Sequence, residues 1–157
     1  MGQQQLLLVI LVTIIVGIAT VVAINIFGTA AEQANKDAIR QDLLAASAQA
    51  QGIWARPEMM GGVGGEFDND VLDDDDFLQL LGMPGTSSTT YDWENENAGY
   101  DITRAPLILT IEATPKGSSG DWTMTVTRNT GATATSSWTV EIIDGDGNIS
   151  RIGQDNT

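Results

Sequence analysis

The sequence predicts an α+β fold in which one long N-terminal helix packs on a small antiparallel β-sheet. Two observations support this prediction. Residues 6–27 form an uncharged apolar run, and a helical pattern continues from this run to Pro57. From Ala105 onward, apolar residues recur at every second position, which is typical of strands with one buried face.

The length of the chain, 157 residues, favours a single domain. We expect the N-terminal helix over residues 1–56, a Gly/Asp-rich connecting loop with a short helix over 57–106, and an antiparallel sheet over 107–157. The helix leaves roughly 100 residues, enough for one modest core. The sheet is therefore expected to form one globular head with residues 30–106.

The apolar run from Leu6 to Phe27 is long enough to cross a membrane. It has no charged residue, and its one strongly polar side chain is that of Asn25. At 1.5 Å per residue, a helix of this length spans roughly 33 Å, about the thickness of a bilayer's hydrocarbon core. The run is longer than the apolar region of a signal peptide and no basic residue precedes it, so we expect it to stay uncleaved.

Residues 28–56 continue the helix but carry apolar side chains on one face only. The apolar stripe recurs at steps of four and three, as in a helix that covers a core on one side. It consists of Ile39, Leu43, Ala46, Ala50 and Ile53. Pro57 ends the pattern, because a proline inside a helix removes a hydrogen bond and clashes with the preceding turn.

The segment 57–106 has the weakest pattern in the chain. Its glycine-rich part, residues 59–67, is no phosphate-binding loop, because no strand precedes it and no lysine follows at the required position. Residues 73–84 predict a short helix that begins with aspartates and turns Leu78 and Leu81 inward. Three aromatic residues are expected to anchor the polar remainder to the core: Tyr91, Trp93 and Tyr100.

Three segments after Ala105 alternate between apolar and polar residues, and turn-forming segments separate them. The apolar sets are Leu107, Leu109, Ile111 and Ala113; Trp122, Met124 and Val126; and Trp138, Val140 and Ile142. A short fourth strand is expected at 148–152. The pattern predicts an antiparallel meander of three or four strands with a threonine-rich outer face.

Composition argues against several classes of function. The chain has no cysteine and no histidine, so it lacks disulfides, thiolate metal ligands and the commonest general base. No nucleophile, base and orienting group can be named together, so we do not expect an enzyme. The net charge is −14, with 21 acidic and seven basic residues, so we expect no direct charge attraction to nucleic acid.

A helix that is apolar in its first half and amphipathic in its second, followed by a small sheet, resembles the type IV pilins. The sequence-specific part of the resemblance lies in the first thirty residues. Pilins often carry glutamate at the fifth mature position, where this chain has Gln5, which can accept a hydrogen bond but brings no charge. The family's short basic leader does not precede Met1, so we expect either a removed leader or a divergent relative without one.

The resemblance implies an assembly core in the apolar half of the helix. Its expected members are Gln5, Leu6, Leu7, Leu8, Ile10, Leu11, Ile14, Ile15, Gly17, Ile18, Val21, Val22, Ile24 and Phe27. The resemblance also implies that the helix around Gly17 to Thr20 loses regularity in a filament, and glycine lowers the cost of such local melting. Glycine is also ordinary in a membrane helix, so both interpretations stay open.

Calcium is the most credible metal ligand, and no other cofactor is expected. Asp144, Asp146 and Asn148 have the spacing of the first three ligands of an EF-hand loop, and Asp155 falls at the twelfth position. Ile149, however, stands where that loop requires glycine. Asp-Gly pairs are a strong hairpin signal, so we favour a plain turn over a calcium site.

Asn148 also begins a possible glycosylation site. Asn148, Ile149 and Ser150 match the N-x-S acceptor pattern, and Asp146 gives it the form of the extended bacterial acceptor. Such short patterns often arise by chance, so the sequence leaves the occupancy of this site open.

We expect a structural subunit that polymerises with itself through its N-terminal helix into an extracellular, type IV pilus-like filament at the cell surface. Before assembly it would lie in the inner membrane, with the pilus assembly machinery as a further partner. The sequence does not specify whether such a filament serves adhesion or another role. The alternative is a single-pass membrane-anchored protein with an acidic extracytoplasmic binding domain.

Overall fold

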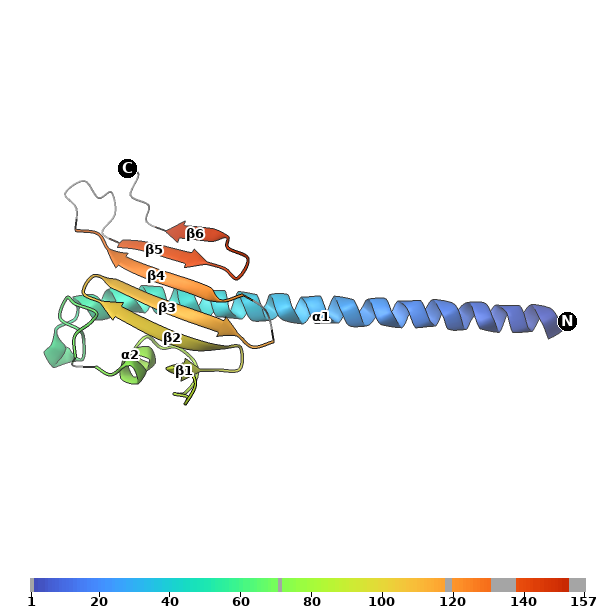
Figure 1. Cartoon of the computed structure of the whole chain (residues 1–157), viewed down its shortest axis with the longest axis horizontal. Coiled ribbons are helices and arrows are strands. Elements are labelled where there is room, and N and C mark those ends of the chain that lie inside the picture. The colour runs from blue at the N-terminus through green and yellow to red at the C-terminus, as the bar shows by residue number, and fades with distance from the viewer. Residues whose placement is uncertain (1, 71, 118–119, 131–137, 153–157) are drawn as a thin grey trace. The chain divides into compact units, whose positions relative to one another are not determined.

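The computed structural model describes residues 2–70, 72–117, 120–130 and 138–152 (Figure 1). The chain divides into two compact units, Met1–Asn35 and Lys36–Thr157. Helix α1 (Gly2–Ala55) contributes to both units. The second unit also contains the 3-10 helix η1 (Glu58–Met60) and helix α2 (Asp74–Leu80). Its strands are β1 (Trp93–Glu94), β2 (Ala98–Ala105), β3 (Ile108–Pro115), β4 (Trp122–Arg128), β5 (Trp138–Ile143) and β6 (Ile149–Ile152). These elements confirm the α+β class.

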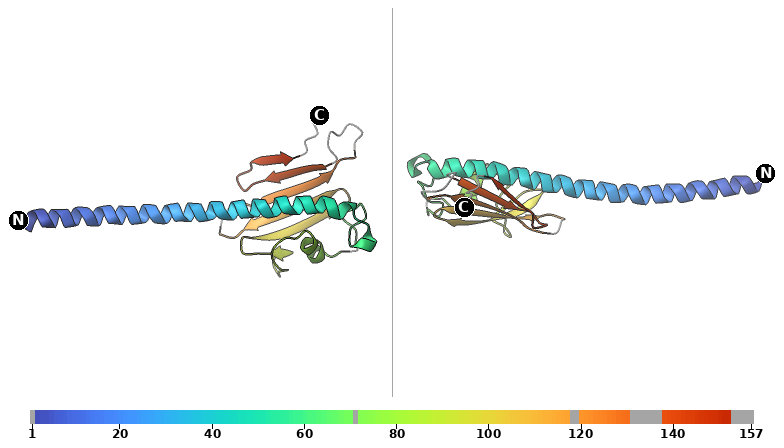
Figure 2. Two further views of the ribbon diagram at one scale, coloured as in Figure 1. Left: turned by 180° about the vertical axis from the view of Figure 1, so that it is seen from behind. Right: turned by 90° about the horizontal axis from the view of Figure 1, so that it is seen from above.

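The six strands form one antiparallel sheet in the order β1-β2-β3-β4-β5-β6. Each strand therefore pairs with its neighbour in sequence, which is the predicted meander. Within the second unit, α1 lies across one face of this sheet (Figure 2). The register aligns apolar residues across that face, for example Leu109 opposite Val126 and Val126 opposite Val140.

The core of the second unit forms where the helix stripe meets the sheet. All five predicted stripe residues are buried, from 0 % exposure at Ile39 to 2 % at Ile53. Most of the predicted inward strand residues are buried with them: Leu109, Ile111, Ala113, Trp122, Met124, Val126, Val140 and Ile142. Leu107 and Trp138 are only half-buried. Removal of this apolar surface from water is the main driving force that holds helix and sheet together.

The sheet has more strands than the three or four predicted, because β1 and β2 lie within the segment 57–106. Strand β2 contains Gly99, and glycine weakens a strand pattern. The Tyr91 ring covers this glycine so closely that a Cβ added there would lie 2.3 Å from a ring carbon. The contact replaces the missing side chain, and it exists only in the folded chain.

The rest of the segment 57–106 follows the prediction closely. Helix α2 begins with aspartates, buries Phe77 and Leu78, and is followed by the buried Leu81. Gly82 then adopts a φ of 71°, the left-handed conformation that commonly ends a helix. Trp93 and Tyr100 are buried and Tyr91 is half-buried, so the three aromatic anchors lie where the sequence predicts them.

A half-buried polar contact joins α1 to β2 beside the apolar core. The Tyr100 hydroxyl donates to Asp42 Oδ2 at 3.0 Å, and Asn95 Nδ2 donates to the same oxygen at 3.1 Å. Burial and the adjacent Asp42 carboxylate raise the pKa of Tyr100. The hydroxyl therefore keeps its proton to a higher pH than an ordinary tyrosine and remains a hydrogen-bond donor to Asp42.

Candidate functional site

The apolar half of α1 presents its side chains outward in every direction. Every large apolar residue from Leu6 to Phe27 is between 48 % and 73 % exposed within the chain. Gln5 and Gly17 are exposed as well, so all the residues predicted for the assembly core lie at the surface of the first unit. A helix that is apolar all round has no stable place in water and needs an apolar environment.

The two threonine hydroxyls within this surface are already satisfied inside the helix. The Thr13 hydroxyl donates to the Ile10 carbonyl and the Thr20 hydroxyl to the Val16 carbonyl, each at 2.8 Å. Because these hydroxyls are bonded internally, they demand no partner from lipid or from a neighbouring chain. Thr29 behaves in the same way with the carbonyl of Ile26 at 3.0 Å.

In the described residues, α1 is the one helix that is long and apolar enough to cross a membrane. None of its most apolar window is buried within the chain, so this part is not a core helix of the second unit. The helix is regular through Gly17 in the single chain. The loss of helix around Gly17 to Thr20 concerns an assembled filament and stays a prediction.

The loop between β5 and β6 forms the hairpin turn that the sequence favours. Asp144 Oδ1 accepts from the backbone N–H groups of Asn148 at 2.8 Å and Asp146 at 3.1 Å. Asp144 Oδ2 accepts from Asn148 Nδ2 at 2.9 Å. These hydrogen bonds, with that of the Asn148 side chain first, lower the pKa of Asp144. Its carboxylate therefore caps the turn as an anion.

Beyond the spacing of its residues, no described feature of this loop supports a calcium site. Both oxygens of Asp144 already accept hydrogen bonds from the turn, and Asn148 faces Asp144 with its donor nitrogen. Among the described residues, no group of three or more Asp, Glu, His or Cys is arranged to hold a metal ion. Asp155, the twelfth position of the predicted loop, lies outside the described residues.

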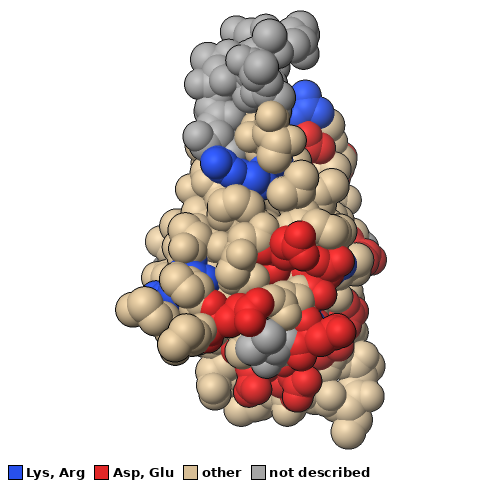
Figure 3. Space-filling model, turned by 90° about the vertical axis from the view of Figure 1, so that its left-hand side faces the viewer, with Lys and Arg blue, Asp and Glu red and all other residues tan. Residues whose placement is uncertain are grey.

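Acidic side chains gather on the face shown in Figure 3, which includes the end of the second unit where α2 lies. The segment 57–76 contains no lysine or arginine, and its acidic residues are Glu58, Glu66, Asp68, Asp70, Asp73, Asp74, Asp75 and Asp76. All of them except Asp74 are exposed. Asp74 pairs with Arg104 at 2.7 Å. These exposures fit a solvated run of charge at the start of the predicted short helix.

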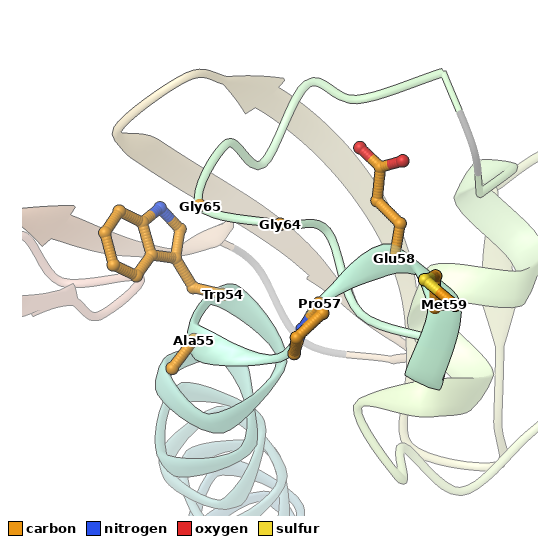
Figure 4. Close-up of a pocket in the computed structure, with 7 residues that line it drawn as sticks. All are labelled: Trp54, Ala55, Pro57, Glu58, Met59, Gly64 and Gly65. Carbon is orange, nitrogen blue, oxygen red and sulfur yellow. The ribbon is translucent and has the colours of Figure 1, made fainter.

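A cavity of about 570 Å³ lies where α1 ends. Figure 4 shows it between the last turn of α1, η1 and the loop through Gly64 and Gly65. Trp54 forms one wall, and its indole N–H finds no acceptor among the described residues. Met59 is 99 % exposed, so one rim of the cavity is an apolar side chain in water. The cavity holds one carboxylate, from Glu58, and no nucleophile.

A second cavity of about 240 Å³ lies beside the β5–β6 turn. Its lining combines Arg40 of α1 with residues of the sheet and turn: Trp122, Ile142, Asp144, Asn148, Ile149 and Ser150. Sequence reasoning identified neither cavity. The second cavity brings together residues far apart in the chain, so no local spacing could have indicated it. The first is lined by residues 54–65 alone, but it depends on the way the loop folds back beside the end of α1.

The comparisons with known proteins add no assignment. No protein-family profile, no curated protein and no solved structure matches this chain.

Proposed function

We propose that this chain is the repeating structural subunit of an extracellular, type IV pilin-like filament. The observation that carries the proposal is the exposure of the apolar residues 6–27 on all sides of α1. In a filament, the same helices from neighbouring copies would cover one another. Burial of apolar surface at about 25 cal/mol per Å² would then supply the association free energy.

Before assembly, the same helix half would lie in the inner membrane, where its length and lack of charge suit it. The acidic second unit would lie on the outer side. Its net negative charge suits an exposed surface that must stay soluble. Transfer from membrane to filament replaces one apolar environment with another and needs an assembly machinery as a partner.

The alternative function is a single-pass membrane anchor with an acidic extracytoplasmic binding domain. The cavity beside Trp54 and Met59 favours a binding role of this kind, because an exposed apolar rim within an acidic surface suits a partner. A minor component of a pilus-like secretion or uptake machine would share the fold of the repeating subunit and differ in its partners.

Fractionation of cells that produce the chain separates these functions. Cells are sheared, the medium is sedimented at high speed, and the pellet is imaged by electron microscopy and labelled with an antibody to the second unit. Filaments that bind the antibody along their whole length support the repeating subunit. Label confined to filament ends indicates a minor component. Recovery only from detergent-extracted membrane, with no filament, supports the anchor.

A further inference from the structure

We propose that Asn148 is an N-glycosylation site on the β5–β6 hairpin, with Asp146, Asn148 and Ser150 as its acceptor sequence. Asn148 begins the single N-x-S/T pattern, with x other than proline, in the 157 residues. The modification requires only that the second unit reaches the outer side of the membrane. It therefore holds for a filament subunit and for a membrane anchor alike.

The structure presents the acceptor at the surface. Asp146, Gly147, Asn148 and Ile149 are all exposed; the first three lie between β5 and β6, and Ile149 begins β6. Gly147 adopts a φ of 82°, which turns the chain sharply just before the asparagine. A transferase can therefore reach the carboxamide without disturbing a buried residue.

The strand that carries Ser150 is an edge strand. β6 lies at one edge of the sheet, and among the described residues it pairs only with β5. Its four residues are exposed or half-buried. Edge segments with few buried contacts open at low free-energy cost, so the acceptor can detach from β5 and enter a transferase in an extended form.

The hydrogen bonds of the turn suit both the free and the conjugated asparagine. Asn148 Nδ2 carries two hydrogens, and it donates one of them to Asp144 Oδ2 at 2.9 Å. A glycan attached to Nδ2 replaces one hydrogen and leaves the other. The bond to Asp144 can therefore re-form after modification, and the turn keeps its cap.

Space for the first sugar exists beside the acceptor. The cavity of about 240 Å³ is lined in part by Asn148, Ser150 and Arg40. Arg40 is exposed and makes no hydrogen bond or ion pair within the described part of the chain. Its guanidinium is a free donor for sugar hydroxyls or for the carboxylate of an acidic sugar.

The reaction requires a glycan donor carried on a lipid phosphate or pyrophosphate, and a membrane glycosyltransferase that catalyses the transfer. The Nδ2 atom of Asn148 attacks the anomeric carbon of the first sugar, and a C–N bond forms. The C–O bond to the phosphate breaks, and the lipid phosphate leaves with the bonding electrons. One proton passes from Nδ2 to a base of the transferase.

Asp146 is the acidic residue of the acceptor sequence. It is exposed, and its ion pair with Lys36 is long, at 3.7 Å. Because such an exposed pair is weak, the Asp146 carboxylate can exchange it for a contact with the transferase.

Mass spectrometry of the chain purified from its source cells tests the proposal. Cleavage after Arg128 and Arg151 gives one peptide, residues 129–151, that contains the whole acceptor. We expect this peptide to carry a glycan mass, and electron-transfer fragmentation to place that mass on Asn148. Membrane and filament fractions are measured separately, so the result does not depend on assembly. An unmodified peptide in both fractions overturns the proposal.

Four variants in the same cells sharpen the test. Asn148→Gln, Ser150→Ala and Asp146→Ala should each lose the glycan mass completely. Asn129→Gln, which changes an asparagine of the same peptide outside the pattern, should retain it. Tryptophan fluorescence checks that each variant is folded. A mass that persists in Asn148→Gln, or that fragmentation places on one of the serines or threonines, overturns the assignment, and retention in Asp146→Ala overturns the role of Asp146.

Discussion

Helix α1 has two apolar surfaces, one exposed and one buried. From Leu6 to Phe27 every large apolar side chain is exposed within the chain, although this stretch is the most apolar in the protein. From Ile39 to Ile53 the apolar residues are fewer and smaller, yet every member of their stripe is buried. The periodicity of apolar residues, rather than their number, decides whether a helix finds its partner within its own chain.

The comparison implies that the two surfaces fail in different ways when they are altered. Residues 6–27 should matter to whatever surrounds the chain, whether membrane or neighbouring copies. Residues 39–53 should matter to the stability of the second unit. Substitutions of the same kind in the two stretches test this division.

The largest expected effect is loss of assembly in Ile14→Asp. A charge at the centre of this helix costs about 2.5–3.5 kcal/mol on membrane insertion, and a filament would bury it again in every copy. We expect no sheared filaments from this variant by electron microscopy. The matched control reverses Asp73, Asp74, Asp75 and Asp76 to lysine. Because three of these four residues are exposed, the control should still assemble.

Normal filaments from Ile14→Asp would show that residues 6–27 are not the assembly core. Loss of filaments from the aspartate control alone, reproduced in the wild type by calcium chelation, would show that the acidic surface binds a metal.

The next effect compares Leu43→Ala with Leu11→Ala, the same substitution in the two stretches. Leu43 is fully buried, so we expect its loss to destabilise the second unit by about 2–5 kcal/mol. Leu11 is 54 % exposed within the chain, and its loss should change the unfolding of the second unit by less than ~0.5 kcal/mol. Chemical denaturation in detergent, followed by near-ultraviolet circular dichroism, measures both. Equal changes in the free energy of unfolding for the two variants would contradict the separate roles of the two surfaces.

A smaller effect is expected from Tyr100→Phe, which removes the hydroxyl that binds Asp42 across the helix–sheet contact. A hydrogen bond to a charged group contributes about 1.5–3 kcal/mol, and we expect the lower end because Asp42 is half-buried. Tyr91→Phe is the control, since no hydrogen bond of its hydroxyl is found among the described residues. The same denaturation experiment measures both, and equal stabilities of the two variants would contradict the role of the contact.

Gln5→Leu should be milder still in its effect on assembly. Removal of one partner of a buried ion pair costs ~3–5 kcal/mol. Gln5 has no charge and forms no ion pair, so its replacement should cost less. We expect Gln5→Leu to yield filaments in amounts close to those of the wild type. Abolished assembly with normal membrane insertion would show that the amide itself is required.

The smallest effect is a pH dependence of the β5–β6 turn. The pKa of Asp144 is lowered in the folded chain, so the folded state binds fewer protons than the unfolded state near that pH. The turn is therefore fully stabilised above the ordinary aspartate pKa and weakens as the pH falls through the lowered value. Nuclear magnetic resonance titration of the Asp144 carboxyl should show this, and Asn148→Ala should raise the pKa. An unchanged titration in Asn148→Ala would contradict the capping role.

The sequence predicts those parts of the fold whose periodicity is local. The stripe from Ile39 to Ile53 and the alternation in β3, β4 and β5 need only the neighbouring residues, and all of these elements form as expected. The Asp-Gly pairs of the β5–β6 turn act locally too.

The parts that sequence reasoning missed depend on distant partners. Strand β2 has few large apolar residues, and the ring that covers Gly99 comes from Tyr91, outside the strand. Asp42 and Tyr100 are 58 residues apart, and nothing near either of them indicates their contact. The lining of the cavity beside the β5–β6 turn is similarly scattered along the chain. The function of residues 6–27 involves partners outside the chain, which its own fold does not contain.

The placement of the aromatic residues has a practical consequence for spectroscopy. All four tryptophans and both tyrosines follow Ile53 in the sequence. Trp54 and Trp138 lie edge to face at 5.3 Å, and the Arg128 guanidinium stands 5.1 Å from the ring of Trp54 and 5.2 Å from that of Trp138. Tryptophan and tyrosine fluorescence therefore reports on the second unit alone, because the first unit contains neither residue. Polymerisation through residues 6–27 should raise light scattering and leave the emission spectrum unchanged, whereas unfolding should shift the emission without scattering.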